Sequence, residues 1–421
     1  MTTVAFVGMT HLGLVSASSI AAKGFRTICF DPDVALIGRL VQQDLPVSEP
    51  GLAEQIAHNA TRGQSFTYTW SDLSAADVVY IAPDVPTDDQ GKSDLTQINT
   101  LIRETLNHLS PDATLVVLCQ VPPGFTRQIN RRGERLYYQV ETLVFGRAVE
   151  RAMEPERYII GCADPAQPLP PAFNEVLQAF GCPILPMRYE SAELAKISIN
   201  ICLVASVSVA NTMAELCEHV GADWHEIVPS LKLDRRIGQY SYLAPGLGIA
   251  GGNLERDLAT VMRLGTAHGT DTGVVAAQVA NSGRRKNWVA EVVQELDLGT
   301  AKLAVWGLAY KENTHSVKNS PSLHTLAQLP NATITAHDPQ VAEGDVTVPL
   351  SRAEDPLTAL DGADALLILT PWPAYREVAP ADIAVKIPGK LVIDPYRVLD
   401  GDAAREAGLG YLTLGVGVVD A

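Results

Sequence analysis

The strongest constraint on the fold is a short apolar segment, residues 4–7, that leads directly into the turn Gly8-Met9-Thr10-His11-Leu12-Gly13. This turn follows the pattern G-x-G-x-x-G, except that Thr10 stands in place of the second glycine. A strand, a glycine turn and a helix in this order present backbone N–H groups and a helix N-terminus to a bound pyrophosphate. We therefore expect a dinucleotide to contact Gly8, Thr10, Leu12 and Gly13.

Asp31 supports this interpretation, because it ends the next expected strand, residues 27–30, 18 residues after Gly13. A carboxylate at this place bonds the ribose 2′-hydroxyl and favours NAD over NADP. A turn of this kind can also be a βα connection that binds nothing, and the Thr10 side chain crowds the closest approach to the phosphates. Farther along the chain only Gly307 stands at a matching turn, so we expect no second dinucleotide site.

Short apolar segments alternate with helical stretches near both ends of the chain. The expected strands are residues 4–7, 27–30, 78–82, 114–119, 302–306, 333–336, 365–369 and 391–393. The middle is helical instead, with stretches at 191–218 and 271–295 and a Pro/Gly-rich loop at 243–252. Strands joined by crossover helices form parallel, doubly wound sheets. We predict an α/β protein in which two Rossmann-like parallel-sheet domains, 1–188 and 298–421, are joined by an all-helical connector, 189–297.

Composition limits the possible functions. The 421 residues are 47% hydrophobic and 19% charged, as in globular proteins, and a single core rarely serves so long a chain. The net charge of −16 argues against binding nucleic acid or an anionic membrane, and no apolar run approaches the ~20 residues of a membrane span. The N-terminus lacks the basic residues of a signal peptide. The six cysteines form no C-x-x-C pair, and the nine histidines show no metal-ligand spacing. We expect a cytoplasmic protein with free thiols and no metal.

Several short motifs occur in an order that is specific as a set. They are Glu49-Pro50-Gly51-Leu52, Val121-Pro122-Pro123-Gly124, Glu193-Leu194-Ala195-Lys196 with Asn200 and Asn211, Asp234 with Arg236-Ile237-Gly238, Gly307-Leu308-Ala309-Tyr310-Lys311, Ser320-Pro321 and Asp338-Pro339. With them the chain resembles the UDP-glucose/GDP-mannose dehydrogenase family over nearly its whole length. The resemblance implies oxidation of C6 of a nucleotide-sugar to a carboxylate with two NAD+, the second step by way of a thiohemiacetal. It also implies two Rossmann-like domains and a homodimer formed through the long helix.

The resemblance also implies a catalytic group. Lys196 and Asn200 lie four residues apart, so they share one helix face, and they match the pair that assists hydride transfer in this family. A Lys beside an amide can hold a water molecule or stabilise a developing alkoxide. Glu141 matches the glutamate that the family places near the reacting carbon, where it would serve as general base. The plain alternative is that all three are ordinary solvated side chains.

One departure from the family concerns its nucleophile. The family loop PGxGFGGSCFPKD corresponds without a gap to residues 245–257, where Asn253 stands at the Cys position, Arg256 at the Lys position, and Asp257 is kept. An amide nitrogen cannot replace the thiolate that attacks an aldehyde. Gln120 likewise stands at the family's threonine before the Val-Pro-Pro-Gly motif. Cys119 and Cys202 are possible substitutes for the thiol, but small buried thiols are common in cores.

Further departures concern the nucleotide. Arg236 and Lys311 are retained and could pair with a diphosphate, whereas Tyr396 and Lys318 stand at family arginine positions. Lysine does not reproduce the bidentate contacts of arginine. We assign Arg236, Lys311, Leu143 and Tyr396 to substrate binding, and Arg256 and Lys318 to the cofactor. Val144-Phe145 replaces an Arg-Glu pair and makes that segment less polar.

We thus predict an NAD-dependent oxidoreductase acting on a nucleotide-sugar or related nucleotide, by two-electron alcohol oxidation or another route without a thiol. Two alternatives stay open. Loss of the thiol favours a nucleotide-binding homologue without catalysis, and the altered positions 144, 145, 318 and 396 favour a dehydrogenase of a non-sugar phosphorylated compound.

Overall fold

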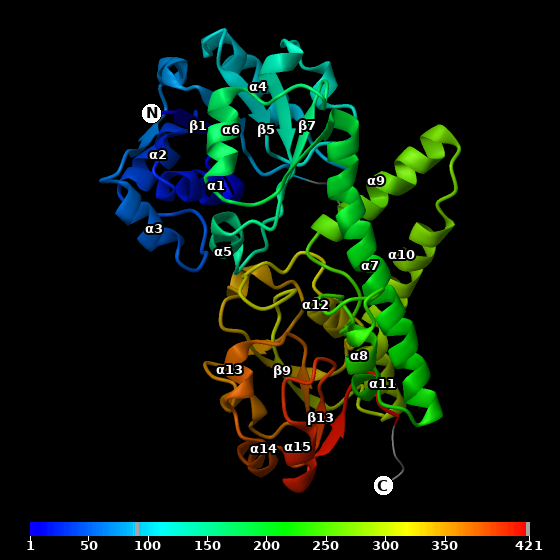
Figure 1. Ribbon diagram of the computed structural model, residues 1–421. Coiled ribbons are helices and arrows are strands. Elements are labelled where there is room, and N and C mark those ends of the chain that lie inside the picture. Colours follow the sequence, from blue (N-terminus) through cyan, green and yellow to red (C-terminus); the bar gives the residue numbers. More distant parts are fainter. Residues whose placement is uncertain (87, 89–91, 418–421) are drawn as a thin grey trace. The chain divides into compact units, whose positions relative to one another are not determined.

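The computed structural model describes residues 1–86, 88 and 92–417 of the chain. These residues form two compact units, residues 1–199 and 200–421, apart from the undescribed positions. Each unit is built around its own parallel sheet, as Figure 1 shows, and each has a separate hydrophobic core.

Within the described part of the first unit, the strands form an eight-stranded sheet of order β3-β2-β1-β4-β5-β6-β7-β8. Neighbouring strands are parallel except for the antiparallel pair β6–β7. The strands are β1 (Thr3–Val7), β2 (Arg26–Phe30), β3 (Gln64–Thr67), β4 (Val78–Ile81), β5 (Thr114–Val117), β6 (Leu136–Gln139), β7 (Tyr158–Cys162) and β8 (Ile184–Arg188). The order 3-2-1-4-5-6 within this sheet is that of a dinucleotide-binding fold.

Helices connect these strands. They are α1 (His11–Ala22), α2 (Val34–Val41), α3 (Leu52–Asn59), α4 (Thr96–His108), α5 (Ala148–Met153) and α6 (Pro171–Gln178). Strands β1, β4 and β5 are buried along their whole length, as expected of strands covered on both faces. Phe6 and Tyr80 stack at the centre of this core, with ring centroids 4.7 Å apart.

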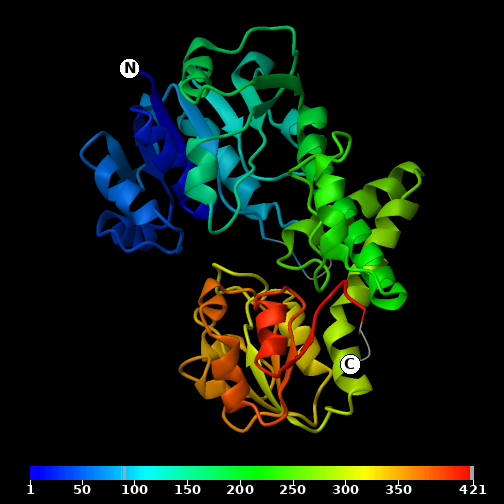
Figure 2. The same ribbon diagram turned by 60° about the horizontal axis from the view of Figure 1, so that its bottom comes forward.

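The second unit combines a helical part with a second sheet. Helix α7 (Tyr189–Val220) runs from the first unit into the second, and α8 (Trp224–Leu233), α9 (Asn253–His268), α10 (Gly273–Lys286) and α11 (Trp288–Glu295) follow. A six-stranded parallel sheet has the order β11-β10-β9-β12-β13-β14 in the described part of this unit. Figure 2 shows helices on both faces of this sheet. The two sheets and the helices between them confirm the predicted fold class.

The elements of the second sheet are short. Its strands are β9 (Lys302–Trp306), β10 (Thr333–His337), β11 (Ser351–Arg352), β12 (Ala365–Ile368), β13 (Leu391–Ile393) and β14 (Gly410–Leu412). Its helices are α12 (Pro321–Ala327), α13 (Pro373–Arg376), α14 (Pro380–Lys386) and α15 (Gly401–Glu406). Trp306 stacks on Tyr375 in the core, with ring centroids 5.1 Å apart.

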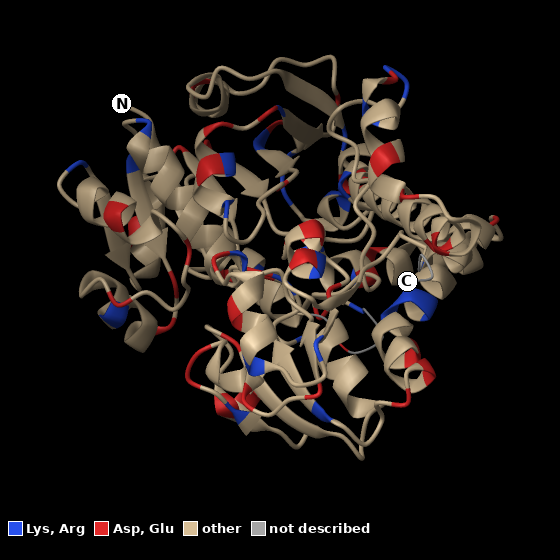
Figure 3. Ribbon diagram, turned by 90° about the horizontal axis from the view of Figure 1, so that it is seen from below, with Lys and Arg blue, Asp and Glu red and all other residues tan. Residues whose placement is uncertain are grey.

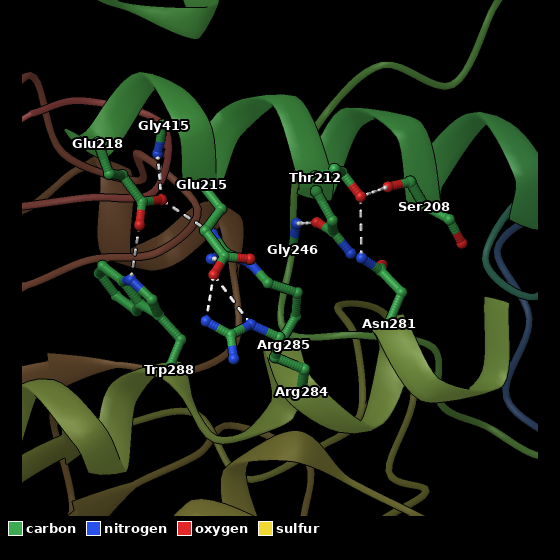
Figure 4. Close-up of polar contacts among 11 residues, drawn as sticks. Ser208, Thr212, Glu215, Glu218, Gly246, Asn281, Arg284, Arg285, Trp288 and Gly415 are labelled. Atoms are coloured by element: carbon green, nitrogen blue, oxygen red, sulfur yellow. Dashed lines mark hydrogen bonds and ion pairs between the residues drawn. The ribbon is translucent and has the colours of Figure 1, made fainter. Parts of the chain in front are cut away.

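Helix α7 bears on the expectation that no apolar segment of the chain is long enough to span a membrane. By length and composition alone it is apolar enough to cross a membrane, although only 33% of its most apolar 18-residue window is buried. Its second half nevertheless makes specific polar contacts, drawn in Figure 4. Glu218 accepts hydrogen bonds from Arg285, Trp288 and the backbone N–H of Gly415, at 2.9, 3.2 and 2.8 Å. A core helix of a soluble fold passes the same test of length and composition.

Charged residues of both signs are interspersed along the ribbon in Figure 3. This distribution accompanies a net charge of −16 and does not single out a basic face on the drawn elements.

Candidate active site

The glycine turn after β1 has the backbone geometry that its sequence requires. Gly8 has a φ of +100°, in the left-handed region that favours glycine. A Cβ on Gly13 would lie 1.8 Å from the carbonyl oxygen of Gly8, so α1 approaches the turn too closely for any side chain there. Leu12 is buried, and it can therefore offer a ligand only its backbone.

Asp31 lies beside this turn at the end of β2. Its Oδ2 accepts the backbone N–H of Met9 at 2.8 Å, and its Oδ1 accepts the N–H of Asp33 at 3.0 Å. Each carboxylate oxygen can accept a second hydrogen bond, so a ribose hydroxyl can still be bound. The fold, the two glycines and this carboxylate fit a dinucleotide.

The second sheet repeats part of this arrangement. After β9, Gly307 has a φ of +97°, and Asp338 accepts the N–H groups of Leu308 and Ala309 at 2.7 and 3.0 Å. In both sheets, therefore, an aspartate accepts backbone hydrogen bonds from the glycine turn that follows a strand, β1 in one sheet and β9 in the other. The close helix approach that Gly13 permits is what distinguishes the first turn.

Thr10 and Asp84 form hydrogen bonds on the side of the β1 turn where the cofactor phosphates are expected. The Thr10 hydroxyl accepts the N–H of Asp84 at 2.8 Å and donates to the carbonyl oxygen of Ala82 at 3.4 Å. The carboxylate of Asp84 accepts the N–H of His11 at 3.1 Å. Asp84 is not among the residues that the sequence patterns predict for the site. Its position three residues after the C-terminal end of β4 could have indicated it, because ligands of open parallel sheets bind at that edge.

A buried carboxylate links the turn to the segment that follows Glu141. Glu49 accepts the N–H groups of Gly146 and Ala148 at 3.1 and 2.7 Å, and its Oε2 lies 3.0 Å from Nε2 of His11. The ring of Phe145 stacks on His11, with centroids 4.2 Å apart. The Phe at position 145 thus packs against the cofactor turn.

Within the first unit, Lys196 and Glu141 come together. Lys196 Nζ lies 3.9 Å from Glu141 Oε2, and both side chains are mostly buried, at 13% and 21% exposure. Glu141 also accepts the backbone N–H of Leu143. A cavity of about 60 Å³ lies beside this segment and is lined by Glu141, Leu143, Gln139 and Arg151 among others. A space of this size with polar walls has room for water.

Glu193 holds the loop that contains the Val-Pro-Pro-Gly motif. It is fully buried one turn before Lys196 and accepts the N–H groups of Gly124 and Thr126 at 2.6 and 2.9 Å. Burial raises the pKa of this carboxyl group above its usual value. Gln120 stands at the start of the same loop, half-buried. Glu193 thereby connects helix α7 to the segment containing Gln120.

Within the second unit, Asn200, Asp257 and Arg256 form a buried group. Asn200 Nδ2 donates to Asp257 Oδ2 at 2.5 Å, and Arg256 Nε lies 3.5 Å from Asp257 Oδ1. All three residues are at least 91% buried. The amide of Asn200 is therefore oriented by the Asp257 carboxyl group, which also lies close to the Arg256 guanidinium.

Asn253 is the first residue of α9, directly after Gly251 and Gly252, which have φ values of +86° and +88°. Two side chains hold the preceding loop: Asn211 Oδ1 accepts the N–H of Gly246 and Ser282 Oγ accepts the N–H of Ile249, both at 2.9 Å. A helix N-terminus stabilises negative charge and lowers the pKa of a thiol placed there. At Asn253 the same place carries a neutral amide.

The remaining predicted residues separate into two groups. Tyr396 and Lys318 lie against the loop before Asn253: a Cβ on Gly246 would be 3.5 Å from Tyr396, and one on Gly252 would be 3.3 Å from Lys318. Burial raises the pKa of Tyr396. Arg236 is 89% exposed and pairs with its neighbour Asp234, and Lys311 lies 5.8 Å from the ring of Tyr310.

A dinucleotide turn, a buried Lys–Glu pair and a second nucleotide-type sheet define a two-domain NAD-dependent dehydrogenase. The chain belongs to the UDP-glucose/GDP-mannose dehydrogenase family. Residues 2–179 match its NAD binding domain, 190–282 its central domain and 304–401 its UDP binding domain. The predicted family, NAD cofactor, nucleotide-sugar site and enzyme class are confirmed.

Relatives match over their whole length. The chain is 27% identical over 435 residues to the UDP-glucose 6-dehydrogenase TuaD of Bacillus subtilis, covering 99% of this chain and 93% of that one. It is 28% identical to the UDP-glucose 6-dehydrogenase of Pseudomonas aeruginosa, with coverages of 98% and 96%. Among solved structures, a UDP-glucose dehydrogenase from Pyrobaculum islandicum aligns with a TM-score of 0.85 and 26% identity, covering 98% of this chain and 97% of that chain.

Proposed function

We propose that this dehydrogenase removes one hydride from the C6 alcohol of a nucleotide-sugar and releases the aldehyde. The observation that carries the proposal is Asn253, an amide at the first position of α9 where the family has its thiol. Bound NAD+ supplies the hydride acceptor. The hydroxyl proton leaves to a base, so that one alcohol gives one aldehyde, one NADH and one proton.

Different residues of the chain have different roles in this reaction. Lys196, mostly buried beside Glu141, donates a hydrogen bond to the alcohol oxygen as its proton departs, and Glu141 accepts that proton directly or through water. Asn200, oriented by Asp257, holds the same oxygen or its water. Gln120 and Asn253 border the reacting carbon, while Leu143, Tyr396, Arg236 and Lys311 contact the substrate. The cofactor contacts Gly8, Thr10, Leu12, Gly13, Asp31, Arg256 and Lys318.

The reaction stops at the aldehyde because no thiohemiacetal forms at position 253. Two of the other cysteines near the proposed groups are poor replacements. Cys119 is fully buried, and burial raises the pKa of its thiol, which disfavours the thiolate. Cys202 lies two residues past Asn200 on α7 and therefore points to a different face of the helix.

Product trapping tests the proposal. The enzyme is incubated with NAD+, hydroxylamine and UDP-glucose, UDP-N-acetylmannosamine or GDP-mannose, and products are identified by mass spectrometry. We expect the oxime of a 6-aldehyde from one of these sugars. A uronic acid as the only product contradicts a single oxidation.

Two other outcomes of this experiment would identify the two alternative functions, nucleotide binding without catalysis and oxidation of a non-sugar phosphorylated compound. Binding of NAD+ and a nucleotide-sugar without turnover identifies a nucleotide-binding homologue, which Asn253 also permits. Turnover of a non-sugar phosphorylated alcohol alone identifies the third function. That function draws support from Arg236, which is exposed and paired with Asp234, and from Tyr396 at a family arginine position.

We further propose a cytoplasmic homodimer with the three parts 1–188, 189–297 and 298–421. An apolar stripe on α7 supports the dimer: Val209, Met213, Leu216 and Val220 are 56%, 38%, 50% and 64% exposed. Their spacing of four, three and four residues places them on one helix face. Exposed apolar patches of this kind mark protein–protein contacts. The free cysteines suit a reducing compartment.

A further inference from the structure

At the N-terminus of α1, the carboxylate of Asp84 accepts a hydrogen bond from the first backbone N–H of the helix. His11 is the first residue of this 12-residue helix, and its N–H donates to a carboxylate oxygen of Asp84 at 3.1 Å. The first N–H groups of a helix have no partner within the helix, and they are the donors that bind phosphate in glycine turns. The Asp84 carboxylate thus uses a donor that a cofactor pyrophosphate requires.

Thr10 holds Asp84 in this position. An N-cap threonine usually accepts a hydrogen bond from its own helix, but the Thr10 hydroxyl makes no such bond. It accepts the N–H of Asp84 at 2.8 Å instead, and it donates to the carbonyl oxygen of Ala82. The threonine in place of the second glycine therefore does more than crowd the turn, because it fixes the backbone from which the carboxylate reaches His11.

The surroundings of Asp84 leave its charge largely uncompensated. Asp84 is exposed, and none of the ion pairs among the described residues includes it. The nearby turn carries a second carboxylate, Asp31, bonded to the N–H of Met9. The ring of His11 is directed to a third, that of Glu49. A pyrophosphate brings two more negative charges to the same turn, where like charges repel.

We propose that Asp84 is an internal competitor of the cofactor pyrophosphate and weakens the binding of NAD+. The cofactor binds when the carboxylate leaves the N–H of His11, and Thr10 opposes that departure. The inference rests on the cofactor assignment and does not depend on which sugar is oxidised. It assigns Thr10 and Asp84 a joint role, because the Thr10 hydroxyl accepts the backbone N–H of Asp84.

Titration of NAD+ without sugar tests this competition, with isothermal calorimetry as the readout. Asp84→Ala removes the carboxylate and should tighten NAD+ binding about three- to tenfold, since anions at helix N-termini contribute energies of that order. Asp84→Asn removes only the charge, because its amide oxygen can still accept from His11, and should give a smaller gain. Thr10→Gly removes the hydroxyl that holds the backbone of Asp84 and should also tighten the binding of NAD+.

A matched control and a stability measurement separate competition from other effects. Glu54→Gln removes one charge from exposed Glu54 on α3 and should leave the affinity unchanged. Without ligand, Asp84→Ala should melt at a lower temperature than wild type because α1 loses its cap. Equal or weaker NAD+ binding by Asp84→Ala, an equal gain in Glu54→Gln, or no binding by any variant overturns the proposal. An active enzyme that gives an aldehyde with such results would leave the proposed function standing.

Discussion

At the scale of residues, the proposed function makes the extent of oxidation depend on single side chains. A thiol at the start of α9 would lie at a helix N-terminus that stabilises its ionised form, whereas Asn253 is neutral and not nucleophilic. In the proposed mechanism the first oxidation depends on different residues, Lys196 and Glu141, which the first unit brings to within 3.9 Å. The loss of one function at position 253 therefore leaves the other in place.

Removing the Lys196 ammonium should slow the first oxidation. Lys196→Met keeps the length of the side chain but loses the donor to the alcohol oxygen, so kcat should fall about 10²- to 10⁴-fold. NAD+ affinity measured by calorimetry should not change. Lys386→Met, which breaks an exposed pair with Asp361, serves as control and should retain full activity. A kcat within threefold of wild type would exclude Lys196 from the chemistry.

The buried Asn200–Asp257–Arg256 group should matter for stability. Asp257→Ala leaves a buried guanidinium without this carboxylate, and such losses lower the free energy of unfolding by about 3–5 kcal/mol. Asp361→Ala removes an exposed ion pair and should cost less than about 1 kcal/mol. Equilibrium urea unfolding compares the two. Equal destabilisation would show that Asp257 is not held as the distances indicate.

At the scale of elements, strands made of one continuous apolar run were predictable, whereas edge strands and two buried strands of mixed composition were not. Residues 4–7, 27–30 and 365–369 coincide with β1, β2 and β12, because each is a continuous apolar run. Among the described residues, six strands, β3, β6, β7, β8, β11 and β14, were not predicted. The edge strands β3, β8, β11 and β14 are short, partly exposed or polar, and exist through pairing with neighbours. Strands β6 and β7 are buried but contain tyrosine, glutamine or glycine, so neither is a continuous aliphatic run. The helical stretch at 271–295 is two helices, α10 and α11, that meet at Asn287.

The candidate site was predictable to the extent that it depends on local motifs. The glycine turn and Asp31 follow from spacing, and the motif residues of α7 from the family resemblance. The contact of Asp84 with His11 joins residues 73 positions apart, and the bonds of Glu49 to Gly146 and Ala148 span 97 and 99. Such contacts depend on the crossing of loops at a sheet edge, which no local pattern specifies.

The exposed stripe of α7 should mediate dimerisation. Val209→Glu places a charge in the stripe, and burying that charge in an interface is costly. We expect wild type to be a dimer and the variant a monomer in light scattering after gel filtration. Val385→Glu, the same change at an 87% exposed position of α14, is the control and should remain a dimer. A monomeric wild type or a dimeric Val209→Glu would contradict the proposal.

At the scale of the whole molecule, two sheets of the same type have different roles. Both carry a glycine turn bonded to an aspartate, yet only the first has a helix approaching that turn as closely as Gly13 permits. The family models accordingly match a NAD binding domain in the first unit and a UDP binding domain in the second.

The number of NADH molecules formed per nucleotide-sugar consumed tests the central claim most directly. With a limiting amount of the sugar that is turned over, absorbance at the end of the reaction gives this number for wild type and for Asn253→Cys. We predict one NADH per sugar for wild type and a rise toward two for Asn253→Cys, because the thiol restores the route to the acid. Two NADH per sugar from the wild-type enzyme would contradict the account.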